Sequence, residues 1–116
     1  MSHDPNCIFC KIAAGQIPSR KVYEDDELIA FHDIAPWAPI HFLIVPKEHL
    51  ASLYDTVPDK HQALLGKMLA LAPGLAREQG ATNGFRTVVN TGADGGQEVP
   101  HLHMHVIGGP RPWAKG

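Results

Sequence analysis

Residues 101–107 read His-Leu-His-Met-His-Val-Ile, so three imidazoles recur at every second position inside an apolar run. On a β-strand, successive side chains point to opposite faces of the sheet. His101, His103 and His105 would therefore share one face, while the apolar residues between them pack on the other. Histidine changes charge near neutral pH, binds metals and can attack phosphorus. The segment thus predicts a strand that buries one face and carries a row of reactive imidazoles on the other.

Length and composition predict one globular domain over residues 1–116. The chain is 44% hydrophobic and 19% charged, and its length is enough for one ordinary core but not for two. No apolar stretch approaches the roughly 20 residues that span a bilayer, and the N-terminus lacks the basic and apolar segments of a secretory signal. We therefore expect a cytoplasmic protein with no membrane partner.

The charge pattern narrows the choice of partner. The formal net charge is -2, and the Lys and Arg residues are scattered along the chain. A nucleic-acid partner is therefore not expected, because binding to a phosphate backbone requires clustered basic residues. A small-molecule ligand fits this composition better.

The order of predicted elements indicates an α+β domain. A short helix over residues 8–14 is followed by strands over 20–24, 27–33 and 40–45. A proline-containing loop at 33–39 separates the second and third of these strands. A long helix over 58–79 then precedes strands over 85–90 and 99–107. This order of elements favours a mainly antiparallel sheet of five strands.

Two details of the long helix are predicted separately. Pro73-Gly74 lies inside its apolar pattern. Proline removes one helical hydrogen bond and glycine is a weak helix former, so a kink or a break is expected there. His61, near the start of this helix, and His3, at the N-terminus, are expected to be exposed.

The loop that leads into the histidine segment is rich in glycine. Residues 90–97 read Asn-Thr-Gly-Ala-Asp-Gly-Gly-Gln. Glycine permits conformations in which consecutive N–H groups point into one concavity and hold an anion. A flexible hairpin connection has the same composition. The three adjacent histidines favour the anion-binding interpretation, with phosphate as the ligand.

Residues 95–109, from Gly-Gly-Gln-Glu-Val-Pro to Ile-Gly-Gly, resemble the histidine-triad (HIT) motif in its Hint-type, nucleotide-binding branch. Further similar segments are residues 8–12, 17–18, 23–26, 30–34, 38–47 and 89–90. The resemblance implies a HIT-like fold with one short and one long helix. It also implies a homodimer with a joined sheet, in which the long helix and the strand over 85–90 form the interface.

The resemblance assigns catalytic roles to four histidines. The middle residue of the triad, His103, would attack the α-phosphorus of a purine nucleoside 5′-phosphoramidate and form a covalent nucleotidyl intermediate. His105 would contact the phosphate and assist the leaving amine, while His101 and His41 complete the hydrogen-bonded set. Water would then release an AMP-like product, and no metal or other cofactor is required for this chemistry.

The nucleotide site is carried over position by position. Apolar side chains would wall the purine, Asp33 would accept hydrogen bonds from the ribose hydroxyls, and the Gly96 N–H with Gln97 would hold phosphate oxygens. The complete implied set is Ile8, Phe9, Ile17, Phe31, Asp33, Ile34, Asn90, Gly96, Gln97, Glu98, Val99, His103 and His105.

A Cys-x-x-Cys pair suggests a second site. Cys7 and Cys10 have zinc-ligand spacing, and in a reducing compartment such a pair indicates metal or redox chemistry rather than a structural disulfide. Related superfamily members with this pair bind structural zinc, which implies His49 and His101 as the other two ligands. Two thiolates and two imidazoles make a closed tetrahedral site. Animal Hint proteins lack the cysteines and keep the fold.

Two departures from the family pattern concern the leaving group. Glu98 stands where animal Hint proteins have serine, and a carboxylate beside phosphate is repelled unless it turns away or is protonated. Residues 110–116 form a tail that is shorter than the familiar Hint tails. The preference for the leaving group is therefore expected to differ.

Three alternatives stay open at this level. A His-x-His strand can by itself be a metal-binding pair. A dinucleoside polyphosphate hydrolase of the fragile-histidine branch is disfavoured, because Gly108-Gly109 replaces the Pro-Arg ending of that branch. A non-catalytic, regulatory nucleotide-binding protein would bind AMP without turnover.

Overall fold

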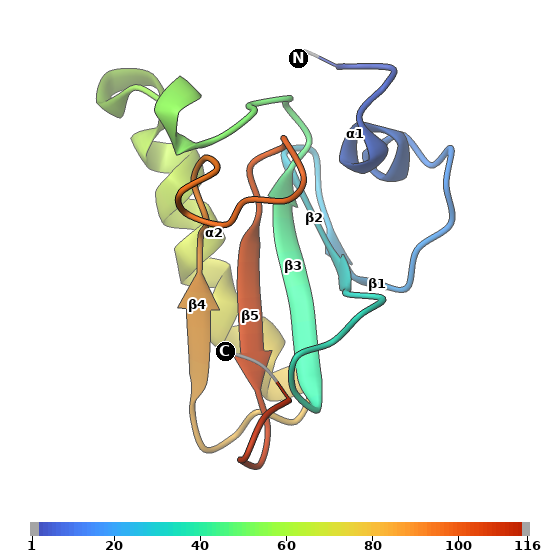
Figure 1. Cartoon of the computed structure of the whole chain (residues 1–116), viewed down its shortest axis with the longest axis vertical. Coiled ribbons are helices and arrows are strands. Elements are labelled where there is room, and N and C mark those ends of the chain that lie inside the picture. Colours follow the sequence, from blue (N-terminus) through green and yellow to red (C-terminus); the bar gives the residue numbers. More distant parts are fainter. Residues whose placement is uncertain (1–2, 115–116) are drawn as a thin grey trace.

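The computed structural model describes residues 3–114 and shows the predicted order of elements (Figure 1). The helices and strands follow one another as α1 (Ile8–Ala13), β1 (Lys21–Glu24), β2 (Leu28–His32), β3 (Ile40–Pro46), a 3₁₀ turn η1 (Leu53–Asp55), α2 (Pro58–Glu78), β4 (Phe85–Val88) and β5 (Met104–Gly108). The expected α+β class with five strands, one short helix and one long helix is confirmed. Only η1 was absent from the prediction.

The five strands form one antiparallel sheet in the order β1-β2-β3-β5-β4. The last strand in the sequence, β5, is thus inserted between β3 and β4. Its partners across the two ladders place Leu43 and Val88 opposite His105. The histidine segment consequently runs through the interior of the sheet rather than along an edge.

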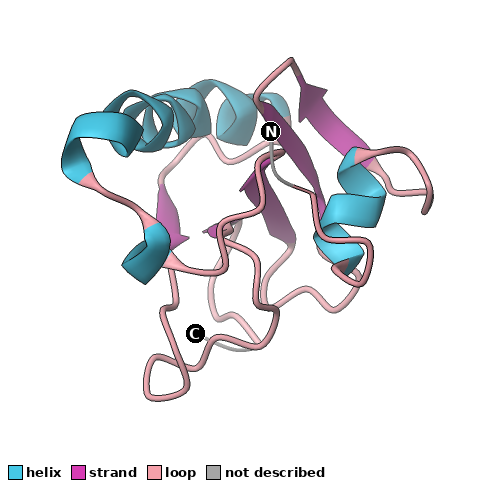
Figure 2. Ribbon diagram, turned by 90° about the horizontal axis from the view of Figure 1, so that it is seen from above, coloured by secondary structure: helices cyan, strands magenta, loops and turns pink. Residues whose placement is uncertain are grey.

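The two helices lie on opposite faces of this sheet (Figures 1 and 2). α2 packs on the face that carries Phe42, Ile44, Met104 and Val106, which are all buried. On the other face, α1 packs against a second buried cluster that includes Leu43. The alternation of β5 is therefore as predicted from Met104 onward, with apolar side chains toward α2 and His105 on the opposite face.

A kink or a break was expected at Pro73-Gly74, and the break is wrong, because α2 runs unbroken through both residues. Proline removes one hydrogen bond. Around it, however, Ala72, Leu75 and Ala76 are buried against the sheet, and apolar burial of this kind stabilises a continuous helix. Within residues 3–114 no helix is both long and apolar enough to cross a membrane.

The last strand begins later than predicted, at Met104 instead of residue 99. The preceding segment makes its hydrogen bonds elsewhere: the His101 N–H donates to Val99 O over 2.8 Å, and the Leu102 N–H donates to Leu50 O over 2.6 Å. His101 and His103 therefore lie in a bent segment that leads into β5.

His61 is buried, with 5% of its surface exposed, so its predicted exposure is wrong. Its Nδ1 accepts a hydrogen bond from the Val57 N–H over 2.9 Å. Val57 precedes the first turn of α2 and has no capping side chain of its own. His61 therefore provides an acceptor for one of the main-chain N–H groups that have no acceptor within the helix. His3 is exposed, as predicted.

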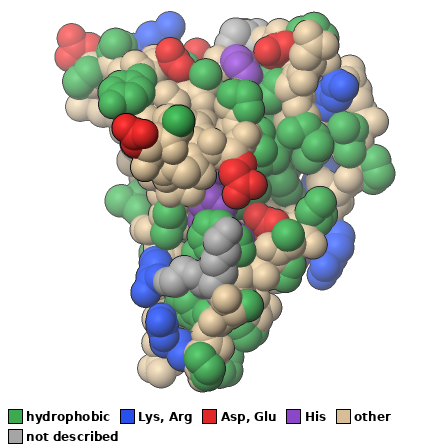
Figure 3. Space-filling model, viewed as in Figure 1, with side chains coloured by type: hydrophobic (Ala, Val, Ile, Leu, Met, Phe, Trp, Pro, Cys, Tyr) green, Lys and Arg blue, Asp and Glu red, His purple; other side chains and the backbone are tan. Residues whose placement is uncertain are grey.

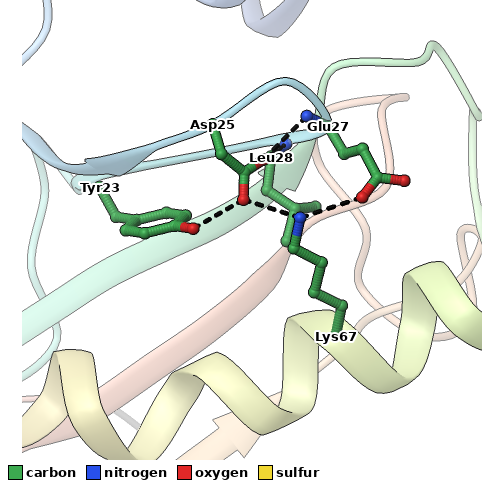
Figure 4. A network of polar contacts seen from close by, with 5 residues as sticks. All are labelled: Tyr23, Asp25, Glu27, Leu28 and Lys67. Carbon is green, nitrogen blue, oxygen red and sulfur yellow. Dashed lines mark hydrogen bonds and ion pairs between the residues drawn. The ribbon is translucent and has the colours of Figure 1, made fainter.

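A polar network ties α2 to the turn between β1 and β2 (Figure 4). The carboxylate of Asp25 accepts hydrogen bonds from Tyr23 Oη (2.6 Å), Lys67 Nζ (2.7 Å) and the N–H groups of Glu27 and Leu28 (2.8 and 2.9 Å). Burial alone would raise the pKa of Asp25, but these donors outweigh it and lower that pKa.

We expect Asp25→Ala to lower the free energy of unfolding by about 1–3 kcal/mol, because it removes the shared acceptor of four donors. Urea unfolding measures this change. The matched control is Asp26→Ala, which changes an exposed neighbouring carboxylate and is expected to be near neutral. Equal effects of the two substitutions would contradict a role for the network.

The same network predicts a pH dependence. Since the pKa of Asp25 is lower in the folded than in the unfolded chain, its contribution is present at neutral pH. That contribution is lost as the pH falls below the unfolded value of about 4. The stability gap between the wild type and Asp25→Ala should therefore narrow in acid.

Candidate active site

Four buried histidine rings gather on the α1 face of the sheet. His103 and His105 lie with ring centroids 5.0 Å apart, and His41 on β3 lies 5.1 Å from His105. All three are at most 6% exposed, and His101 is fully buried. The β3–β5 register, which pairs Leu43 with His105, brings His41 and His105 onto this face. The ladder therefore joins residues that are 64 positions apart.

The ring of His103 is held by the main chain two residues before it. Its Nδ1 lies 2.6 Å from His101 O, and because a carbonyl only accepts, Nδ1 carries the proton. The neutral ring then has its lone pair on Nε2. Phe9 on α1 packs edge-on against this ring, with centroids 5.2 Å apart. This arrangement orients one unprotonated nitrogen of a buried imidazole.

A chain of hydrogen bonds sets the tautomers of the other two rings. The Trp37 N–H donates to His41 Nδ1 over 3.0 Å, so neutral His41 carries its proton on Nε2. That Nε2 lies 2.9 Å from His105 Nδ1 and donates to it. His105 therefore carries its own proton on Nε2. Burial lowers the pKa of His41, although Asp33, 3.5 Å away, opposes this effect. Burial thus disfavours the charged form of His41, and in the neutral tautomers the proton of His105 lies on Nε2.

A cavity of about 780 Å³ opens beside these rings. In Figure 3 hydrophobic side chains gather on this side of the molecule, and histidine is visible at the centre of the face. The structure brings twelve of the predicted site residues together in the cavity wall: Ile8, Phe9, Ile17, Phe31, Asp33, Ile34, Asn90, Gly96, Glu98, Val99, His103 and His105. His41 and His101 lie behind this wall, where they contact the rings that form it.

Gln97 is the one predicted nucleotide residue outside the cavity wall. Its Nε2 donates to Ala51 O (2.6 Å) and to Val99 O (2.9 Å), and its Oε1 accepts from the Gly92 N–H (2.9 Å). The Gly96 N–H is also used within the loop, since it donates to Ala93 O over 3.1 Å. Gln97 therefore braces the loop.

The glycines of this loop have two conformational roles. Gly92 and Gly96 adopt positive φ values of 70° and 78°, which non-glycine residues rarely adopt. At Gly95, a Cβ atom would collide with the main-chain oxygen of Thr91. The loop can therefore close tightly beside the histidines only with glycine at these positions.

Two main-chain donors without an acceptor lie at the end of this loop. Among residues 3–114, the N–H groups of Glu98 and Val99 have no acceptor, and both residues line the cavity. Unpaired main-chain donors in a concave site suit an anion.

The predicted metal ligands also converge. The ligand atoms of Cys7, Cys10, His49 and His101 all lie within 4.8 Å of one another. His101 Nδ1 is 3.2 Å from Cys7 Sγ, 3.6 Å from Cys10 Sγ and 3.2 Å from His49 Nδ1. A tetrahedral zinc ion with Zn–S near 2.3 Å and Zn–N near 2.05 Å requires ligand separations of about 3.3–3.6 Å for these pairs. The cluster therefore has the size of a zinc site.

The protonation of His101 also fits a metal ligand. Its Nε2 lies 2.7 Å from Pro46 O, so Nε2 carries the proton and Nδ1 presents its lone pair to the cluster. Burial lowers the pKa of His101 to about 4, which keeps the ring neutral. Burial also raises the pKa of the Cys10 thiol, and a bound cation would reverse this effect.

Trp37 is the main contributor that the sequence reasoning missed. It lines the cavity, and its indole stacks on the His105 ring with centroids 4.6 Å apart and planes at 22°. The available signal was an aromatic residue between two prolines, four positions before His41. His32, which also lines the cavity, was likewise not assigned.

Comparisons with known proteins agree with this geometry. The HIT domain family matches residues 14–111. Protein HitA of Neisseria gonorrhoeae is 55% identical over 105 residues, which cover 90% of this chain and 97% of HitA. Purine nucleoside phosphoramidase of Escherichia coli (strain K12) is 46% identical over 103 residues, which cover 88% of this chain and 86% of the enzyme.

A solved structure gives the same result. A histidine triad protein from Clostridium difficile superposes with a TM-score of 0.89 at 48% identity, covering 96% of each chain. The resemblance identified from residues 95–109 is thus confirmed over most of the sequence. The chain belongs to the HIT domain family.

Proposed function

We propose that this protein hydrolyses purine nucleoside 5′-phosphoramidates at the phosphorus–nitrogen bond, through a covalent nucleotidyl-His103 intermediate. The observation that carries the proposal is the hydrogen bond from His103 Nδ1 to His101 O, which leaves the Nε2 lone pair on a ring that lines the cavity. The similarity to purine nucleoside phosphoramidase supports the substrate class.

The reaction proceeds in two displacements at phosphorus. His103 Nε2 attacks the α-phosphorus, a nitrogen–phosphorus bond forms, and the bond to the amine breaks. The amine departs with the electron pair of that bond and takes one proton from solvent, which is returned to solvent by the water that attacks in the second step. Water then attacks the same phosphorus, the bond to Nε2 breaks, and the nucleoside monophosphate is released with the ring again neutral. Because His103 Nδ1 stays hydrogen-bonded to His101 O, the positive charge on the nucleotidyl ring is stabilised in the intermediate.

Hydrogen-bond donors with fixed positions would stabilise the negative charge that develops on the phosphate in the transition state. The hydrogen-bond chain from Trp37 through His41 leaves the proton of His105 on Nε2, where it would donate to the phosphate. The N–H groups of Glu98 and Val99 supply two main-chain donors. Donors that are already oriented stabilise the transition state without further reorganisation.

The remaining cavity walls fit a nucleoside. Phe9 and Phe31, with ring centroids 5.5 Å apart, provide apolar surface for a purine together with Ile8 and Val99. One Asp33 oxygen accepts from the Ala35 N–H over 2.8 Å, which fixes the carboxylate at the cavity edge. Its remaining lone pairs would accept from ribose hydroxyls.

We also propose that Cys7, Cys10, His49 and His101 bind one structural zinc ion. A closed site of this kind holds α1 against the segment that leads into β5. It needs both cysteines as thiolates, which is consistent with a reducing, cytoplasmic location.

A homodimer with a joined sheet is proposed from the outer edge of β4. β4 is the last strand of the sheet and pairs only with β5 within the described residues. Open strand edges invite pairing with another chain. Leu69 on α2 is 57% exposed and Val89 after β4 is 36% exposed, which would give such an interface apolar area.

The wild type is expected to release AMP and free amine from adenosine 5′-phosphoramidate, whereas His103→Ala should lower kcat by about 10³-fold or more while AMP still binds. Chromatographic product analysis measures turnover, and calorimetry measures AMP binding. Mass spectrometry of quenched wild-type enzyme should detect the nucleotide on His103.

The control for this substitution is His3→Ala, which changes an exposed histidine and should leave turnover unchanged. Full activity of His103→Ala would overturn the covalent route. Faster hydrolysis of diadenosine polyphosphates than of the phosphoramidate would overturn the assigned substrate class.

Elemental analysis is expected to find one zinc per chain, and Cys10→Ser should reduce this content to near zero and lower Tm. Turnover should fall as well, because His101 both faces the metal cluster and orients His103 through its carbonyl. Retention of a full equivalent of zinc in Cys10→Ser would contradict the proposed ligand set.

Light scattering at micromolar concentration should give twice the chain mass of 12.6 kDa. Leu69→Glu is expected to shift this mass toward the monomer, because it places a charge on the apolar surface beside β4. A monomeric wild type would refute the joined sheet.

A further inference from the structure

We propose that Trp37 is a positioning residue for catalysis: its indole fixes the plane of the His105 ring and thereby aims the Nε2–H at the bond to the leaving amine. This inference rests on the proposed function, since it concerns the donor that acts at the same phosphorus. It assigns to the proline-flanked loop before β3 a role beyond lining the cavity.

One hydrogen bond does not by itself fix the plane of the His105 ring. His105 Nδ1 accepts from His41 Nε2 over 2.9 Å, which fixes the position of one ring atom. The ring can still rotate about its bond to the side chain, because this torsion in histidine has a broad energy profile. Such a rotation displaces Nδ1 together with Nε2, so the hydrogen bond limits it only to the range of angles that a hydrogen bond tolerates. Within that range the direction of the Nε2–H bond still changes.

The indole of Trp37 restricts that rotation. Its plane lies at 22° to the plane of the His105 ring, with centroids 4.6 Å apart, which is a stacked arrangement. On another side, His103 meets the same ring nearly edge-on, at 67° and 5.0 Å. A stacked neighbour fixes the tilt of a ring, whereas the hydrogen bond fixes only its edge. Both contacts therefore restrict the direction in which the Nε2–H bond points.

Trp37 also acts on the first ring of the chain. Its main-chain N–H sets the tautomer of His41, and its indole lies 4.9 Å from the His41 ring. The side chain and main chain of one residue thus orient both histidines. Pro36 and Pro39 flank it in the loop, and proline restricts the backbone around it.

The test compares Trp37→Leu, which keeps an apolar side chain but removes the ring, with Trp37→Phe, which keeps a ring. For Trp37→Leu we expect kcat on adenosine 5′-phosphoramidate to fall about 10–100-fold with KM within about 3-fold of wild type, because misaimed catalytic groups cost rate rather than binding. Trp37→Phe should recover kcat to within about 3-fold. Equal losses in both variants, or no loss in Trp37→Leu, would overturn the proposal.

A second measurement is independent of turnover. Long-range ¹H–¹⁵N spectra of the wild type should show His105 as the Nε2–H tautomer, with its ring protons shifted upfield by the indole. Trp37→Phe should keep a smaller upfield shift, and Trp37→Leu should lose it and broaden the signals. Unshifted ring protons in the wild type would refute the positioning role even if a variant failed to fold. If the wild type shows this signature but does not cleave phosphoramidates, the proposed function fails and the positioning of His105 stands.

Discussion

The hydrogen bond between His103 Nδ1 and His101 O is the contact on which the candidate active site depends. Three groups of His101 are committed at once: its carbonyl to His103, its Nε2 to Pro46 O at the end of β3, and its Nδ1 to the cysteine cluster. The orientation of the nucleophile is therefore coupled to the sheet and to α1 through one buried residue. A displacement of the sheet or of α1 that moves His101 would therefore also move the ring of His103, whose Nδ1 is hydrogen-bonded to His101 O.

The fold was predictable where periodicity is local. The alternation around Met104 and the apolar run of β3 identify strands because each depends only on neighbouring residues. The start of β5 was not predictable in this way, since the Leu102 N–H donates to Leu50, 52 positions earlier. The long helix was predicted, but the continuity of α2 through Pro73 was not, for a related reason. Helix propensity at Pro73 is a local quantity, whereas the burial that overrides it comes from the sheet.

The candidate site was also predictable only in part, since the positions of its residues were predicted and their contacts were not. The cavity wall was predicted from the family resemblance, which carries positions such as Asp33 and Val99 without any need for coordinates. Hydrogen-bond roles were less accessible. Gln97 lies in the predicted loop, yet its amide contacts Ala51 and Val99, and only the folded geometry reveals this use. The stacking of Trp37 on His105 likewise depends on the pairing of β3 with β5, which no short motif encodes.

The two faces of β5 contribute to different properties of the protein, one to its stability and the other to its chemistry. Met104 and Val106 pack toward α2, where they contribute to stability, while His105 points to the opposite face among the residues of the cavity. Substitutions on one face therefore act on folding free energy with little direct effect on the chemistry. A substitution of His105, on the other face, acts directly on the chemistry. The apolar residues of β5 that face α2 can therefore be substituted during evolution while His105 is retained. The stability of the protein can change in this way without loss of its function.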